Sequence, residues 1–110
     1  MGKYVIQKTS SGQFRWNLKA ANGQTLITSE SYSSKQACKN GIASSQKNIA
    51  EDSFALLSSK KGDPYFNQLS RNKQILGTSQ MYTSAAARDN GIASVQKNAP
   101  TASIEDLTKA

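Results

Sequence analysis

The chain has 110 residues, of which 36% are hydrophobic and 19% are charged, and its formal net charge is +7. A chain of this length and polarity is expected to fold as one compact domain, residues 1–110. With one cysteine, Cys38, and no histidine, it cannot form an internal disulfide or a zinc site built from Cys and His ligands. We therefore interpret Cys38 as a structural residue rather than a nucleophile.

The N-terminal residues lack the apolar segment of a signal peptide, and no stretch approaches the ~20 apolar residues of a membrane span. We expect a cytoplasmic protein with no membrane partner. The positive charge is concentrated in the first half, because residues 1–50 hold seven basic residues and one acidic residue. Such a surface can attract polyanions, and a purely solubilising role is the favoured interpretation.

The chain repeats itself. The nonapeptide at residues 40–48 returns 50 residues later with one substitution, Val95 in place of Ser45. At the same shift the two halves align without a gap. The pattern indicates a tandem duplication, with repeats at residues 3–49 and 53–99.

Three strands are expected in the first copy. Residues 4–8 are rich in β-branched and aromatic side chains, which favours a short strand ending at a Ser-Ser-Gly turn. Residues 14–20 alternate apolar and polar, which predicts a half-buried second strand. The Asn-Gly pair at residues 22–23 favours a two-residue type I′ hairpin, in which both central residues need positive φ. The chain then folds back as a third strand over residues 24–29.

A helix should follow, capped by Ser33 or Ser34, whose hydroxyl can accept a bond from a first-turn amide. Its packed stripe is narrow and contains Gly41, which returns as Gly91. A glycine inside a helix costs about 1 kcal/mol relative to alanine. The repeated glycine therefore predicts close approach of the helix to the sheet or to the other helix, with a helix break as the alternative.

The nonapeptide motif is interpreted as helix packing rather than as a ligand site. Its glutamines, Gln46 and Gln96, are expected to bind backbone groups. The motif residues concerned are Asn40, Gly41, Ile42, Ala43, Asn90, Gly91, Ile92 and Ala93.

The second copy departs from the first in its second hairpin. Lys73 replaces the hairpin glycine, and Gln68 stands in place of Leu18, so this hairpin should be the less regular one. Residues 100–110 form a C-terminal tail, which either frays or adds a final strand.

The runs that begin at Phe14, Thr28 and Asn40, with their repeats, closely resemble the YegP-like family of small bacterial proteins of unknown function. The resemblance covers residues 3–98 almost entirely, in the fused tandem form. It implies an α+β fold of two tandem β-β-β-α repeats with pseudo-two-fold symmetry. It also implies an antiparallel sheet with helices packed on it, sheet edges shared between the halves, and an exchanged strand after each helix. The halves are expected to satisfy each other's edges and leave a monomer, an internal pseudo-dimer, whereas an edge left open would permit a dimer.

The sequence predicts no catalytic, cofactor-binding or metal-binding residue, and an enzyme is the least favoured class. The favoured function is a non-catalytic interaction or binding module with an unknown protein partner. Such a module can accept an added strand at an exposed sheet edge, and an unguarded edge strand would distinguish it. The alternative is a basic binder of single-stranded RNA or DNA or another polyanion. Its contacts would be Arg15, Lys19, Lys35 and Lys39.

Overall fold

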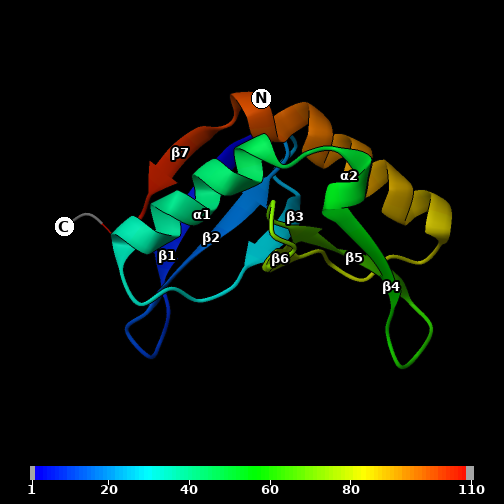
Figure 1. Cartoon of the computed structure of the whole chain (residues 1–110), viewed down its shortest axis with the longest axis horizontal. Helices are drawn as coiled ribbons and strands as arrows, with labels where there is room; N and C mark the ends of the chain where they lie inside the picture. The colour runs from blue at the N-terminus through cyan, green and yellow to red at the C-terminus, as the bar shows by residue number, and fades with distance from the viewer. Residues whose placement is uncertain (1, 109–110) are drawn as a thin grey trace.

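A computed structural model describes residues 2–108 and contains a seven-stranded sheet with two helices packed over one face (Figure 1). The mixed α+β class expected from the sequence is confirmed. Two β-β-β-α units follow one another along the chain and are succeeded by one more strand. The strands are β1 (Lys3–Lys8), β2 (Phe14–Lys19), β3 (Thr25–Ser29), β4 (Phe54–Ser58), β5 (Pro64–Leu69), β6 (Ile75–Thr78) and β7 (Ser103–Asp106). The helices are α1 (Lys35–Lys47) and α2 (Ala85–Asn98), with 3-10 turns η1 (Glu51–Ser53) and η2 (Ala99–Thr101).

The strand order is β4-β5-β6-β3-β2-β1-β7, so the two repeats meet at the centre of one sheet. There β3 and β6 are antiparallel, with Thr28 opposite Thr78. At one end β7 pairs with β1 in parallel, so the sheet is mixed and the prediction of an antiparallel sheet is wrong at this edge. The reason is that η2 delivers the chain to the start of β1, where the Ser103 amide donates to the Gly2 carbonyl at 3.2 Å.

The core lies between the sheet and the two helices. On β2, Trp16 and Leu18 are fully buried and belong to the same cluster as Cys38 and Ile42 of α1. The ring of Tyr4 meets that of Trp16 edge to face, with centroids 5.2 Å apart. The predicted alternation of β2 is therefore confirmed, and its polar residues lie on the face of the sheet that carries no helix.

The hairpin after β2 differs from the prediction. The Gly23 amide donates to the Ala20 carbonyl at 2.9 Å and the Ala20 amide to the Gln24 carbonyl at 2.9 Å, which closes a three-residue loop. Gly23 has φ +85°, whereas Asn22 is not among the described residues with positive φ. The two-residue type I′ turn is therefore wrong. Between Leu18 and Lys19 the register shifts by one residue, which leaves Leu26 of β3 as the extra residue of a bulge. A three-residue loop of this kind needs only one left-handed position, its last.

Both helices run unbroken through their glycines, so the alternative of a helix break is wrong. Ser34 caps α1 by accepting from the Ala37 amide at 3.1 Å, as predicted. A Cβ atom on Gly41 would lie 2.7 Å from Cζ of Tyr32 and closer still to its hydroxyl oxygen. Glycine is thus needed because a tyrosine ring packs directly against the helix backbone. Gly91 meets Tyr82 in the same way.

In the part of the chain that the structure describes, neither helix is long and apolar enough to cross a membrane.

Candidate functional site

The two outer strands of the sheet differ in how they are protected. Among the described residues, β4 has a strand neighbour on one side only, and its sequence Phe-Ala-Leu-Leu-Ser contains no charge and no proline. The opposite outer strand, β7, carries Glu105 and Asp106. Charged side chains on an outer strand discourage the addition of another strand. Strand β4 is therefore the unguarded edge.

The main-chain groups of Leu56 point outward from this edge. Leu56 stands opposite Phe66 on β5. Phe66 directs its own amide to Ser79 Oγ at 3.0 Å and its carbonyl to the Ser79 amide at 2.9 Å, on the side away from β4. In an antiparallel ladder, the amide and carbonyl groups of two paired residues either face each other or face apart. Because the amide and carbonyl of Phe66 face away from Leu56, those of Leu56 face solvent.

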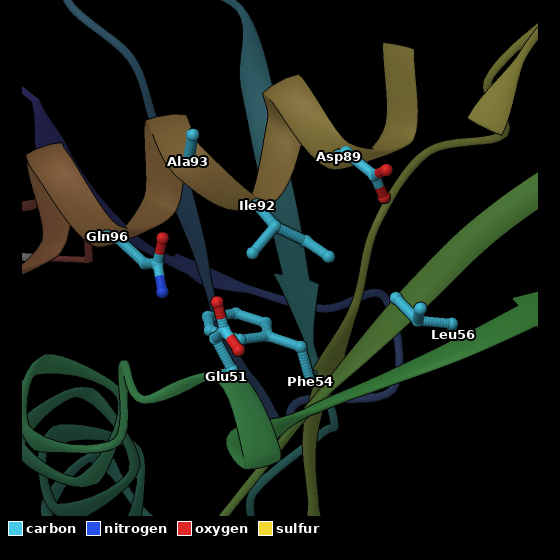
Figure 2. A pocket seen from close by; sticks show the side chains of 7 residues that line it. All are labelled: Glu51, Phe54, Leu56, Asp89, Ile92, Ala93 and Gln96. Atoms are coloured by element: carbon cyan, nitrogen blue, oxygen red, sulfur yellow. The ribbon is translucent and has the colours of Figure 1, made fainter. Parts of the chain in front are cut away.

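A groove of about 470 Å³ runs between this edge and α2. We call it the β4 groove. Figure 2 shows Ile92 pointing from α2 toward β4, with Phe54 and Leu56 opposite it. The Leu56 side chain is 56% exposed, although it lies on the same face of the sheet as the buried Phe54. The lining residues are Glu51, Phe54, Leu56, Asp89, Ile92, Ala93 and Gln96.

The charged residues that line the β4 groove are both acidic. Glu51 and Asp89 lie on either side of Ile92 (Figure 2). Nε of Arg88 lies 3.3 Å from a carboxylate oxygen of Asp89, but the arginine side chain is only 15% exposed and does not line the groove. The Asp89 side chain is 62% exposed. The groove is therefore apolar along its floor and acidic at its ends.

The corresponding space in the first half is filled by β7. Ile104 stands opposite Tyr4, and the last described bond of the pair runs from the Leu107 amide to the Ile6 carbonyl at 3.0 Å. Two ion pairs hold the strand: Lys3 to Glu105 at 3.2 Å and Lys35 to Asp106 at 3.1 Å.

The pKa of Asp106 lies at about 2, below its ordinary value. Hydrogen bonds from the hydroxyl and the amide of Thr108 are the largest cause, and the neighbouring Lys35 also contributes. The carboxylate that fastens β7 to α1 is thus ionised throughout the neutral range.

Gln46 and Gln96 position the segments that lead into the two outer strands. Nε2 of Gln96 donates to the Ile49 carbonyl at 2.8 Å, just before η1 and β4. Nε2 of Gln46 donates to the Ala99 carbonyl at 3.3 Å, just before β7. The predicted contacts of these glutamines with the backbone are therefore present. Each glutamine lies on one helix and binds the connection that follows the other helix.

The four basic residues proposed as polyanion contacts do not form one surface. Arg15 and Lys19 alternate with buried residues of β2 and lie on the helix-free face of the sheet. Lys35 and Lys39 lie on α1, which covers the other face. Lys35 is also engaged with Asp106. The sequence could not predict this separation because the residues come from different elements.

The repeated motif is divided between the core and the β4 groove. Gly41, Ile42 and Gly91 are buried, while Ile92 and Ala93 line the groove. Asn40, Ala43 and Asn90 are exposed. The groove role of Ile92 was missed, because its copy Ile42 is covered in the first half and the two sequences are alike here.

The sequence also gave no signal for a buried polar triad formed by Tyr4, Ser45 and Gln68, all fully buried. The Tyr4 hydroxyl and Ser45 Oγ are 2.7 Å apart, and Ser45 Oγ donates to Oε1 of Gln68 at 2.7 Å. Gln68 was noted only as a departure from the first copy. It is in fact a hydrogen-bonded core residue.

The described residues hold no group of three His, Cys, Asp or Glu side chains that could bind a metal ion. Burial, and to a smaller extent the charge of Asp106, raises the pKa of the Cys38 thiol to about 11. A buried thiol of this kind is protonated at neutral pH and is a poor nucleophile.

Two β-β-β-α units that share one sheet, with an open edge on the second unit, define this chain as a duplicated α+β protein. It belongs to the family described as a domain of unknown function, DUF1508, whose model matches residues 10–54 and again residues 59–106. The resemblance to YegP-like proteins is thereby confirmed.

Among relatives, UPF0339 protein YegP of Yersinia pestis is 45% identical over 67 residues, which are 60% of this chain and 60% of that protein. The chain thus spans less than two thirds of that curated relative. The solution NMR structure of UPF0339 protein SO3888 from Shewanella oneidensis superposes with a TM-score of 0.90 at 50% identity, covering 96% of this chain and 91% of that one. The structure of yegP from E. coli, a protein of unknown function, gives 0.93 at 42% identity over 99% and 95%. The relatives are uncharacterised, and none of these names indicates catalysis.

Proposed function

We propose that the protein is a non-catalytic binding module that accepts an extended peptide of a partner protein as an added strand at β4. The observation that carries the proposal is the difference between the two halves. Strand β7 fills the outer edge of β1, whereas the matching edge of β4 is uncharged and borders an open apolar groove. The feature that would distinguish a strand acceptor is therefore found at β4.

Strand addition would use two kinds of contact. The outward amide and carbonyl of Leu56 supply main-chain hydrogen bonds, which do not depend on the peptide's sequence. Every second side chain of the peptide would enter the β4 groove between Leu56 and Ile92, and these side chains would supply specificity. Leu56 and Ile92 would gain burial in the complex, which favours association.

We also infer pseudo-two-fold symmetry about the pair Thr28 and Thr78, which are copies of each other and stand opposite one another. In this description residues 1–110 are one compact domain with repeats at 3–49 and 53–99. Strand β7 is then the strand exchanged between the halves. The equivalent position beside β4 accepts a strand of a partner protein. A monomeric state and a cytoplasmic location are part of the proposal.

A polyanion has less support as the ligand. Arg15 and Lys19 lie together on the helix-free face, but Lys35 and Lys39 lie on the other side of the sheet. A nucleic acid would therefore meet only part of the basic set, and the affinity that counterion release provides grows with the number of phosphates contacted.

The test blocks the outer edge with proline. Proline is tolerated on an outer strand where the replaced amide faces solvent, so Leu56→Pro should keep the fold and remove the hydrogen-bond donor. Ile104→Pro is the matched control, because Ser103 and Leu107 direct their amides to β1 and the Ile104 amide faces outward from β7. A library of displayed random peptides is panned against the wild-type protein.

We expect enriched peptides to bind the wild type and Ile104→Pro equally and to lose binding to Leu56→Pro. Peptides that bind all three proteins alike would show that the β4 edge is not the binding site.

A further inference from the structure

Resting on the proposed function, we propose that the β4 groove selects cationic extended segments of a partner protein, in which an apolar side chain is flanked by Lys or Arg. We further propose that it rejects acidic strands such as the chain's own β7.

The occupied edge is matched to an acidic strand. Lys3 and Lys35 pair with the two carboxylates of β7, at 3.2 Å and 3.1 Å. Charged groups arranged in this way fix which strand binds and suppress others.

The second half lacks these cations. At the shift of 50 residues, Ser53 stands in place of Lys3 and Ala85 in place of Lys35, while Asp89 replaces Lys39. Glu51 adds a second carboxylate at the other end of the groove. The charge around the β4 groove is thus opposite to the charge around β7 in the first half, although the apolar residues are retained in both halves.

The carboxylates are accessible to a ligand. Glu51 is exposed and forms no ion pair in the described part of the chain, and the ion pair of Asp89 there is with the largely buried Arg88. An apolar side chain of a bound strand would lie over Ile92. Lysine or arginine two positions before or after this residue lies on the same face of the strand, and it can pack an aliphatic stem along the apolar floor and place its charge at Glu51 or Asp89.

A second copy of this chain is a poor occupant by the same reasoning. Its β7 would bring Asp106, which lies on the same face of the strand as Ile104, into the groove with Glu51 and Asp89, and like charges brought together at an interface are costly. The groove therefore stays open in the presence of the chain's own acidic strand.

Two peptides that differ only in charge test the proposal. One copies residues 101–108, and the other has lysine in place of the aspartate that corresponds to Asp106, the charged residue that shares a face of the strand with Ile104. Each is titrated into the full ¹⁵N-labelled protein. We expect the lysine peptide to shift the amide signals of Leu56 and Ile92 and to bind about tenfold more tightly, because an exposed ion pair replaces a repulsion between like charges. The difference should shrink as salt is added.

Charge reversal in the protein provides the matched variant. Glu51→Lys combined with Asp89→Lys should invert the preference between the two peptides; both positions are exposed, and lysine already occupies the Asp89 position in the first repeat as Lys39. Equal binding of both peptides at Leu56, or an unchanged preference in the variant, overturns the charge selection and leaves strand addition intact. If neither these peptides nor panned peptides reach Leu56, strand addition itself fails. A dimer of the wild type that protects the Leu56 amide overturns the assignment of a foreign strand.

Discussion

The polar triad of Tyr4, Ser45 and Gln68 offers a test of how the two halves of the core are specified. At the shift of 50 residues these positions are occupied by Phe54, Val95 and Leu18, all buried in the same core cluster. Each of these two equivalent places in the core draws residues from both repeats. One place is held by hydrogen bonds, and the other is filled with apolar side chains. Converting the triad to its apolar counterpart should be tolerated only if all three members change together.

The single change Gln68→Leu removes three hydrogen bonds. Besides accepting from Ser45 Oγ, the Gln68 amide donates to the Ser45 carbonyl at 3.0 Å and to the Asn48 carbonyl at 2.8 Å. Polar groups left buried without a partner cost about 1–3 kcal/mol, so the free energy of unfolding should fall by that amount. Replacing all partners by apolar groups of similar shape is nearly neutral. The triple variant Tyr4→Phe, Ser45→Val, Gln68→Leu removes the side-chain partners, although the Ser45 and Asn48 carbonyls still lose their donor, so it should be more stable than Gln68→Leu and less stable than the wild type.

The assay is urea unfolding followed by the fluorescence of Trp16, the one tryptophan, which is fully buried. The single, double and triple variants form a thermodynamic cycle. Coupling among the three positions should recover the part of the loss caused by Gln68→Leu that comes from the unpaired hydroxyl of Ser45. If the changes in unfolding free energy add to within about 0.5 kcal/mol, the members act independently and the reasoning is refuted.

Three further predictions concern the hairpins, the helix packing and the acid response. Lys73 has φ 69° at the loop position that Gly23 holds in the first copy, and this left-handed conformation is costly for a residue with a Cβ atom. Lys73→Gly should therefore raise the free energy of unfolding by about 1 kcal/mol, and Gly23→Lys should lower it. Urea unfolding would measure both changes. Gly41→Leu should cost about 1–3 kcal/mol through overpacking against Tyr32, whereas Ala43→Leu, exposed on the same helix, should leave the melting temperature nearly unchanged. Because the folded pKa of Asp106 is lowered from 3.8 to about 2, its carboxylate stabilises the fold above the ordinary pKa and this contribution is lost as pH falls through the folded value. Asp106→Asn should remove this contribution to the pH dependence of amide exchange in β7. If the variant and the wild type show the same pH dependence, the role of Asp106 is contradicted.

Much of the fold was accessible from the sequence because local patterns and the repeat agree. Period-two alternation in residues 14–20 and the Ser34 cap each report on neighbours in sequence. The turn at Asn22 was wrong because its type depends on a bulge in the adjoining strand pair, which the Asn-Gly signal does not report. The parallel pairing of β7 was not accessible either, since it depends on where α2 ends relative to β1.

The candidate site was less accessible than the fold. Strand β4 lies at the open end of the sheet because of the spatial order of the seven strands, which the sequence does not report. The repeat instead suggested that both edges of the sheet would be paired. Ile92 and Ile42 are identical in type and lie in nearly identical motifs, yet Ile92 lines a groove whereas Ile42 is buried. Their difference comes from β7, which lies beside one repeat and has no counterpart beside the other among the residues that the structure describes.

The most direct test of the central claim is amide hydrogen exchange at Leu56 in the full chain, with and without the lysine-substituted peptide of residues 101–108. We predict fast exchange at Leu56 in the free protein, slow exchange at Leu57, whose amide faces β5, and slowing at Leu56 when the peptide saturates the protein. Protection of Leu56 in the free protein, or no change on saturation, would contradict the assignment of β4 as a strand-accepting edge.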